Sequence, residues 1–229
     1  NRVDLKKLGA DFAYTVDGET SGSIEDETFS ADGVEIKIHG VSAHPGFAKG
    51  KMESAIKIAS EIIAFLPKEK LSPESTEGKE GFIHPTAMKG TVEYASIEFI
   101  VRDFTDEALR AHEHVLKSIT ETVMQKYPNA RFEFNVVEQY RNMKKILDQH
   151  PKVVEFGLMA IEQAGLVPKL QRIRGGTDGS RLSYMGLPCP NIFAGEHAFH
   201  SKQEWVSVQD MQKAVETIIR LALIWERHS

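Results

Sequence analysis

The sequence has little of several features that define large classes of proteins. It contains a single cysteine, Cys189, in 229 residues. One cysteine excludes an internal disulfide framework and a zinc site built from cysteines, and it favours the reducing environment of the cytoplasm. No apolar run approaches the ~20 residues of a membrane-spanning helix, and no secretory signal is visible. We therefore expect a cytoplasmic protein without membrane contact.

Positive charge is also scarce, because 28 Lys and Arg residues stand against 33 Asp and Glu residues, giving a formal net charge of -5. Nucleic-acid binding requires a basic surface, so this balance argues against a nucleic-acid partner. Hydrophobic residues make up 41% of the chain and charged residues 27%, which is typical of a globular protein. The length allows one large domain or two ordinary ones.

The middle of the chain alternates between strand and helix periodicities. Its predicted elements are a strand at 34–40, a helix at 52–66 that Pro67 ends, two antiparallel strands within 88–104 that turn near 94–96, a helix at 106–127 and a strand at 131–140. This is the βαββαβ order of a ferredoxin-like domain, with one antiparallel sheet and two helices on one face.

The two flanks carry a different pattern. They contain a short apolar strand at 12–18, a helix at 151–164, strands within 169–176 and 187–195, and a final amphipathic helix capped by Ser207. Alternating strands and helices indicate an α/β layer. We predict an α/β domain formed by residues 1–25 and 142–229, interrupted by a ferredoxin-like domain at 26–141.

Candidate metal ligands lie at two strand ends. Asp17 ends the first predicted strand, where α/β sheets gather ligands, although an Asp-Gly pair is also a common turn. Glu196, His197 and His200 follow a buried strand and suggest a zinc site, since histidine is a frequent metal ligand. A polar loop with incidental histidines is the alternative.

Two further residues belong to the middle block. His44 lies between a strand and a helix, where Pro45 and Gly46 force a turn, and it is placed to donate to a carbonyl or carboxylate. An exposed loop histidine is the alternative. Arg102 is either a carboxylate clamp or one half of a surface ion pair with Asp103.

The segment RIRGGTDGSRLSYMGLPCPN begins with two arginines beside paired glycines. Arg174 with Gly175 and Gly176 suits the binding of an anion, because glycine lets a ligand approach backbone N–H groups. The alternative is a strand, a glycine turn and a helix capped by Thr177 or Asp178. Cys189, between two prolines, is a small buried side chain rather than a nucleophile.

Five blocks in this order resemble the M20 family of metallopeptidases. They are YTVDG, VSAHPGFAKGKMESAI, EGFIHPTAMKGTVEYASIEFIVRDF, IRGGTDGSRLSYMGLPCPN and FHSKQEW followed by the final helix. The resemblance implies part of a zinc-exopeptidase-like catalytic domain interrupted by a lid that also forms a homodimer. It also implies an enzyme that uses two zinc ions to release the N-terminal residue of tripeptides.

The resemblance further implies roles for single residues. Asp17 and His200 correspond to ligands of the two zinc ions, and His44 would reach the partner subunit's active site to polarise the scissile carbonyl. Arg102, and Arg174 with Gly175 and Gly176, would hold the peptide substrate. Glu196 and His197 receive no role.

Other parts of the family's site have no counterpart in this sequence. An HxD motif, a bridging aspartate and a Glu-Glu pair precede the Asp17 strand in the family, whereas the residues before Asp17 contain no histidine and no Glu-Glu pair. We therefore interpret the chain as the C-terminal portion of such an enzyme. We expect it to bind no zinc pair and cleave no peptide by itself, and to expose apolar surface.

Two other functions remain open at this stage. The chain is alternatively a non-catalytic dimerisation or peptide-binding module with the same fold, or part of another M20 hydrolase such as an aminoacylase or a carboxypeptidase.

Overall fold

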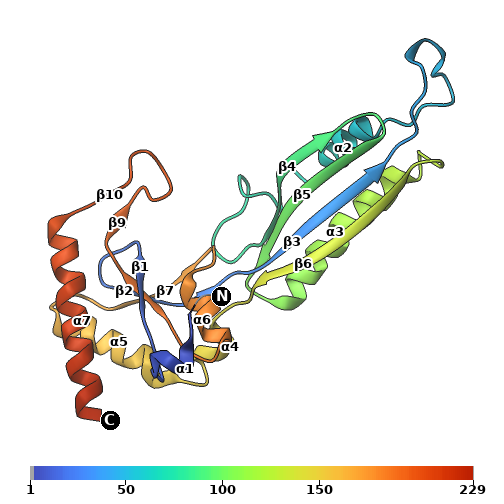
Figure 1. Cartoon of the computed structure of the whole chain (residues 1–229). Helices are drawn as coiled ribbons and strands as arrows, with labels where there is room; N and C mark the ends of the chain where they lie inside the picture. Colours follow the sequence, from blue (N-terminus) through green and yellow to red (C-terminus); the bar gives the residue numbers. More distant parts are fainter. Residues whose placement is uncertain (1–2, 229) are drawn as a thin grey trace. The chain divides into compact units, whose positions relative to one another are not determined.

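The computed structural model describes residues 3–228, and the chain divides into two compact units (Figure 1). The inserted unit is Ser30–Tyr140, and the flanking unit combines Asn1–Phe29 with Arg141–Ser229. Each unit has its own hydrophobic core.

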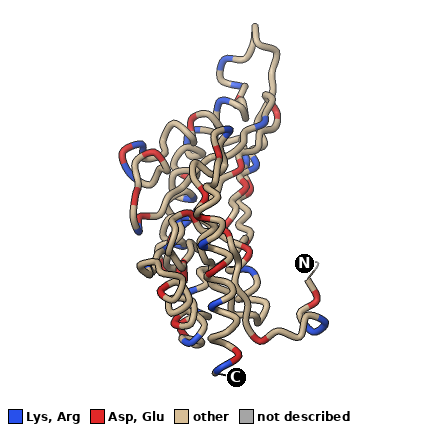
Figure 2. The backbone as a smooth tube through the Cα atoms, turned by 90° about the vertical axis from the view of Figure 1, so that its left-hand side faces the viewer, with Lys and Arg blue, Asp and Glu red and all other residues tan. Residues whose placement is uncertain are grey.

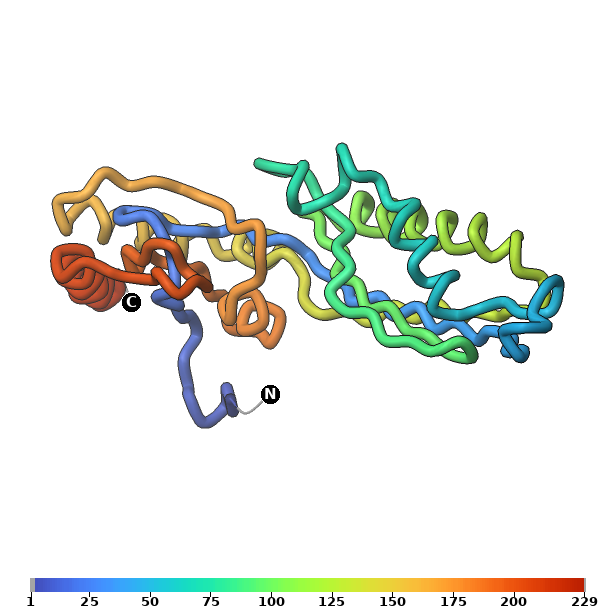
Figure 3. Tube along the Cα trace, turned by 90° about the horizontal axis from the view of Figure 1, so that it is seen from above, coloured from blue at the N-terminus to red at the C-terminus, as the bar shows by residue number. Residues whose placement is uncertain are grey.

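The inserted unit has the βαββαβ order that the sequence predicts. Its elements are β3 (Ser30–His39), η1 (Pro45–Phe47), α2 (Ala55–Ala64), β4 (Phe82–Gly90), β5 (Tyr94–Asp103), α3 (Asp106–Met124) and β6 (Arg131–Tyr140). The strands form one antiparallel sheet in the order β4-β5-β3-β6. Both helices lie on the same face of this sheet (Figure 3).

Alternation along β3 creates the core of the inserted unit. Val34, Ile36 and Ile38 are buried, while the residues between them are partly exposed. They pack against buried apolar residues of α2 and α3, such as Ile58 and Leu116. The period-2 strand and the amphipathic helices therefore bury complementary faces, as the sequence pattern requires.

Several boundaries in this unit differ from the sequence prediction: β3 begins at Ser30 rather than at 34, and β4 begins at Phe82 rather than at 88. The turn between β4 and β5 lies at 91–93 rather than at 94–96, because Thr91 accepts the backbone N–H of Tyr94 on its hydroxyl, at 3.2 Å. Helix α2 starts at Ala55 rather than at Met52, since Glu53 forms a β-bridge with Val41.

The flanking unit is a mixed sheet with helices. Its strands β1 (Thr15–Gly18), β8 (Asn191–Phe193), β2 (Ser23–Thr28) and β7 (Lys169–Ile173) lie side by side in that order. Its other elements are the hairpin β9 (Glu196–His197) with β10 (Trp205–Val206), and the helices α1 (Leu5–Leu8), α4 (Lys144–Leu147), α5 (Pro151–Gln163), α6 (Asp178–Tyr184) and α7 (Val208–His228).

Strand β2 is absent from the sequence prediction, because SIEDET has no apolar alternation. Residues 26–29 consequently belong to the flanking unit and not, as expected, to the inserted domain. The reason is a pair of hydrogen bonds with the returning chain: Thr28 N–H donates to Asn142 Oδ1 at 3.1 Å, and Met143 N–H donates to Thr28 Oγ1 at 3.2 Å.

Helices α5 and α7 pack together against the sheet. Tyr14 links them to β1, since its hydroxyl donates to the carbonyl of Val153 at 2.6 Å and accepts from Trp225 Nε1 at 3.1 Å. Ser207 caps α7 as predicted, accepting the Asp210 N–H at 2.9 Å.

Helix α7 also has a second, exposed apolar stripe. Its members recur at helical spacing, and they are Val208, Met211, Val215, Ile218, Ile219 and Leu223. Ile219 is 56% exposed. An exposed apolar stripe of this length is unusual for a monomer and typical of a surface that packs against another segment. The sequence pattern predicts Val208, Met211, Val215, Ile218 and Leu223 on or near the buried stripe, so their exposure corrects that prediction.

The described helices include none that is both long and apolar enough for a membrane span. Lys and Arg are mixed with Asp and Glu along the backbone, so neither sign of charge dominates the face shown in Figure 2.

Gly40, just after β3, allows a close approach of three backbone segments. A Cβ there would lie 2.5 Å from the carbonyl oxygens of Glu53 and Val92, and neither can move without breaking the packing of α2. We expect Gly40→Ala to lower the free energy of unfolding of the inserted unit by about 2–3 kcal/mol. Urea unfolding followed by circular dichroism measures this, and exposed Lys89→Ala is the control. Equal stability of the two variants would contradict the prediction.

Candidate functional site

Asp17 lies at a β-bulge near the carboxyl end of β1. Strand β1 runs parallel to β8, with Val16 opposite Ile192 and Gly18 opposite Phe193, so Asp17 has no partner in the ladder. Bulges re-aim side chains and recur beside active sites. The Asp17 side chain is exposed at the strand end where α/β sheets bind ligands.

Gly18 brings β1 and β8 into close contact. A Cβ at Gly18 would lie 2.9 Å from the Cα of Phe193, and the Gly18 carbonyl accepts the N–H of Ala194 at 2.7 Å. Because the two strands run parallel, the residues that follow each of them emerge at the same edge of the sheet. Asp17 and Glu196 therefore share this edge.

Glu25 is a buried carboxyl in the same neighbourhood, on β2. It is 4% exposed, and it accepts a hydrogen bond from Asn191 Nδ2 at 2.5 Å. Burial raises its pKa to about 7 against the opposing effect of the Asn191 hydrogen bond, and the negative charges of Asp17, Glu19 and Glu196 add to the increase. Sequence reasoning missed Glu25, because nothing in SIEDET distinguishes a buried glutamate from a surface one.

Glu196 links Asp17 electrostatically to His200. Burial raises the pKa of Glu196, and the charges of Asp17 and Glu204 raise it further, whereas His200 lowers it. Asp17 and His200 thus both act on one carboxyl group, although they are far apart in sequence. The assignment of Asp17 and His200 to one metal site stays a prediction.

The loop that carries His200 has an unusual backbone. Ala198 and His200 have φ angles of 51° and 60°, a region that residues other than glycine rarely adopt. The Ser201 hydroxyl donates to the Ala198 carbonyl at 2.6 Å, and Glu204 accepts the His200 N–H at 2.8 Å. Such strain is common at ligand-binding sites.

The sequence assigns no role to His197, and in the structure its side chain packs against an aromatic ring. Its ring stacks on Trp205, with centroids 4.3 Å apart, within the β9–β10 hairpin. The hairpin therefore fixes the base of the His200 loop.

Asp17 and His200 are of residue types that bind zinc, but two ligands are too few for a zinc site. Asp17 offers a carboxylate and His200 an imidazole, both ordinary zinc ligands. Within residues 3–228, however, no three His, Cys, Asp or Glu side chains are grouped closely enough to hold a metal ion. A closed tetrahedral site needs more ligands than these two.

The arginine–glycine turn surrounds Phe29. The Arg174 guanidinium lies 5.3 Å from the centroid of the Phe29 ring, and the Gly175 carbonyl accepts the Phe29 N–H at 3.2 Å. Thr177 caps α6 with a capping box, so the helix start follows the simpler interpretation of this motif. The substrate-binding role of Arg174, Gly175 and Gly176 stays a prediction.

Gly179, at the start of α6, is the glycine of this motif whose position leaves least room for a side chain. A Cβ at Gly179 would lie 2.5 Å from the Cys189 carbonyl oxygen. Cys189 itself is buried, and burial raises the pKa of its thiol to about 11, which leaves it unreactive as expected.

His44 and Arg102 belong to the inserted unit. The Nδ1 atom of His44 accepts the Gly46 N–H at 3.2 Å, so in the neutral ring the proton is on Nε2. The exposed His44 side chain can therefore donate a hydrogen bond from Nε2.

Arg102 does not form the ion pair with Asp103 that was the alternative to a carboxylate clamp. Asp103 instead pairs with His112 Nε2 at 3.0 Å and accepts the Thr105 N–H. Burial opposes ionisation of Asp103, but these hydrogen bonds outweigh it and lower its pKa. The Arg102 guanidinium lies 5.8 Å from the Phe82 ring centroid, and its Nε is buried without a hydrogen-bond acceptor among the described residues.

Both units have similar sequences among known proteins. Residues 27–131 match a family model described as a peptidase dimerisation domain of M20 type. The chain is 44% identical over 225 residues to peptidase T of Caldanaerobacter subterraneus, covering 98% of this chain and 55% of that protein. The chain thus spans about half the length of the curated relatives it matches.

Solved structures show the same fold. Aminopeptidase PepT from Bacillus cereus superposes with a TM-score of 0.76 at 24% identity, and a tripeptidase from Staphylococcus aureus with 0.80 at 19%. Each comparison covers 96% of this chain and 58% of the other. Residues 27–131 are thus similar to a peptidase dimerisation domain, and nearly the whole chain is similar in sequence to about half of peptidase T.

Proposed function

We propose that this chain is the C-terminal part of a cytoplasmic, zinc-dependent tripeptide aminopeptidase, which releases the N-terminal residue of its substrate. The 44% identity to peptidase T over 98% of the chain carries this proposal. The shared action of Asp17 and His200 on Glu196 supports it, because two metal ligands of one site must lie in one electrostatic neighbourhood.

Zinc would supply Lewis acidity toward water and the scissile carbonyl. Asp17 and His200 would each hold one of the two ions, with the other ligands coming from outside this chain. Arg174, with the backbone of Gly175 and Gly176, would bind the peptide's carboxylate, as would Arg102, whose Nε lacks an acceptor. The Nε2–H of His44 would donate to the scissile carbonyl and stabilise the charge that develops there.

The assembly in this proposal is a homodimer formed through the inserted unit. Its support is the match of residues 27–131 to a peptidase dimerisation domain. The exposed stripe of α7 is then covered by the segment that supplies the missing ligands.

A chimera tests the proposed chemistry. The chain alone should not hydrolyse a tripeptide with added zinc, because two ligands do not hold the ions. Fusion to the part of Caldanaerobacter peptidase T that it does not match should give hydrolysis, and Asp17→Asn or His200→Ala should lower kcat by about 10³-fold or more. The exposed Asp11→Asn variant is the control.

Failure of a folded chimera to cleave tripeptides would favour the non-catalytic alternative. Cleavage by the unfused chain, abolished by His200→Ala, would overturn the fragment interpretation.

Mixed dimers test whether His44 acts in the partner's site. A dimer of one His44→Ala chimera and one Asp17→Asn chimera contains one site with both residues intact only if His44 acts across the interface. Random mixing of the two inactive variants should then restore about a quarter of the unmutated activity, since half the dimers carry one working site each. Activity assays over a range of mixing ratios measure this. No recovery would place His44 in its own subunit's site.

Glu25 gives a pH dependence that needs no metal. Its raised pKa means that the folded protein holds a proton more tightly than the unfolded chain between pH 4.5 and about 7. The contribution of Glu25 to the free energy of unfolding is therefore largest below pH 4.5. It falls as the pH rises from 4.5 through about 7. The charges that face it are those of Asp17, Glu19 and Glu196.

Glu25→Gln keeps an oxygen acceptor for Asn191 without the charge. Relative to the unmutated chain, we expect this variant to gain on the order of 3 kcal/mol in free energy of unfolding between pH 4 and pH 8. Urea unfolding at a series of pH values measures the difference, with exposed Glu162→Gln as the charge-matched control. Parallel pH profiles for Glu25→Gln and the unmutated chain would contradict the assignment.

A further inference from the structure

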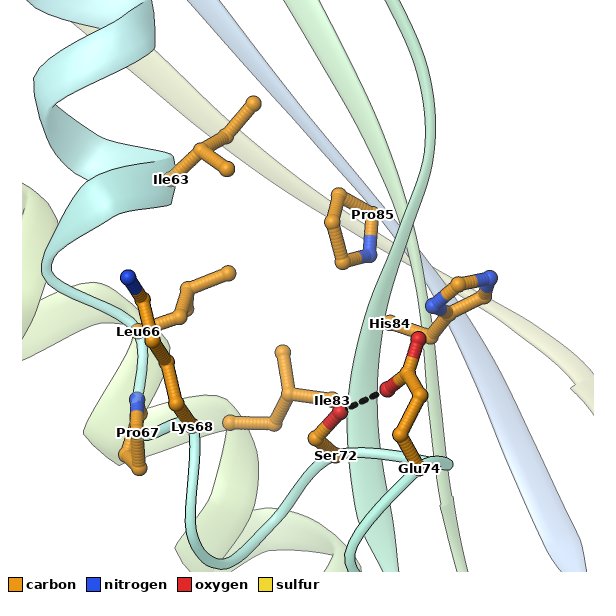
Figure 4. Close-up of a pocket in the computed structure, with 9 residues that line it drawn as sticks. All are labelled: Ile63, Leu66, Pro67, Lys68, Ser72, Glu74, Ile83, His84 and Pro85. Carbon is orange, nitrogen blue, oxygen red and sulfur yellow. Dashed lines mark hydrogen bonds between the residues drawn. The ribbon is translucent and has the colours of Figure 1, made fainter.

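The inserted unit has a pocket of about 400 Å³ whose lining does not include His44 or Arg102 (Figure 4). The pocket lies between the end of α2, the loop at 65–81 and the start of β4. Its lining residues are Ile63, Leu66, Pro67, Lys68, Ser72, Glu74, Ile83, His84 and Pro85. This volume is within the range of pockets that bind small molecules.

The loop that closes the pocket is fixed and locally strained. Leu71 has a φ of 58°, which is rare for a residue other than glycine, and its carbonyl accepts the Ile83 N–H at 2.9 Å. The bond ties the loop to β4 beside the pocket. Strain of this kind is often retained where a loop serves a ligand.

The interior of the pocket is apolar. Ile83 is buried in the core of the unit, and Ile63 and Leu66 pack against that core. Pro85 forms the β4 side of the wall and faces Ile63 across the pocket (Figure 4). These residues offer contact to an aliphatic side chain.

The rim carries charges of both signs on opposite sides. Glu74 lies beside His84, and Lys68 lies across the pocket from them (Figure 4). A hydrogen bond from the Ser72 hydroxyl and a backbone hydrogen bond lower the pKa of Glu74, which favours its ionised carboxylate. Lys68 makes no ion pair within the described residues, which leaves its ammonium available to an anion.

We propose that this pocket binds a free amino acid with an aliphatic side chain, such as leucine. The ligand's carboxylate pairs with Lys68, its ammonium pairs with Glu74, and its side chain lies among Ile63, Leu66, Ile83 and Pro85. A zwitterion is favoured because the rim offers one charge of each sign, and an aliphatic side chain is favoured because Ile63, Leu66, Ile83 and Pro85 offer it apolar contact.

The proposal goes beyond the proposed peptidase function and does not depend on it. Free amino acids are nevertheless the class of product that an aminopeptidase releases. The pocket is therefore placed to report product concentration to the inserted unit. Binding can be measured on the chain as it is, without metal or activity, so failure of either proposal leaves the other intact.

Isothermal titration calorimetry of the full chain with L-leucine tests the binding. We expect saturable binding, weakened about tenfold or more by Lys68→Gln and by Glu74→Gln, since each variant removes one charge-assisted contact. Lys70→Gln and Glu77→Gln are the matched controls, because both residues are exposed on the same loop outside the lining. All four changes are at exposed positions, so circular dichroism should show an unchanged fold.

Ligand analogues identify which end of leucine each residue holds. L-leucinamide lacks the carboxylate and should bind weakly to the unmutated chain, with no further loss in Lys68→Gln. N-acetyl-L-leucine lacks the ammonium. It should bind weakly to the unmutated chain, with no further loss in Glu74→Gln. Glycine, without a side chain, should not compete. Absence of saturable leucine binding, equal binding of the analogues, or equal loss in the controls would each overturn the proposal.

Discussion

The close parallel pairing of β1 with β8 is the constraint on which the candidate site depends. Gly18 permits it, because any side chain at that position would collide with the backbone of Phe193. The pairing leaves Asp17 in a bulge and directs the chain after β8 to the same edge of the sheet. Without that approach, Asp17 and the Glu196–His200 segment would be separate surface features with no shared electrostatics.

Concentrating acidic groups at this edge has an energetic consequence. Glu25, buried beside Asn191, carries a pKa near 7 because its charge is both desolvated and repelled by Asp17, Glu19 and Glu196. Protonation of Glu25 or a bound cation would relieve this repulsion. The loop at Ala198 and His200 also adopts an unfavourable conformation, with positive φ angles, at the place where a ligand is expected.

The inserted unit depends on a different principle. Its antiparallel sheet and two helices form a self-sufficient core, and its special features lie at the periphery, in the His44 turn, at Arg102 and in the Leu71 loop. A rigid centre with functional loops is a common division of labour in proteins. It lets the His44 turn and the Leu71 loop vary without disturbing the core of the unit.

The sequence alone determined the βαββαβ order and the cap at Ser207, and it narrowed the cap of α6 to Thr177 or Asp178, because periodicity and capping are local properties. The assignment of Asp17 and His200 as metal ligands rests on the resemblance of the motif blocks and stays a prediction. The sequence pattern failed for β2, for the residues at 26–29 and for Glu25. Burial of a polar strand, the return of the chain at Asn142, and a pKa set by distant carboxylates exist only after folding. The tertiary structure decided these, since long-range contacts and desolvation leave no periodic trace in the sequence.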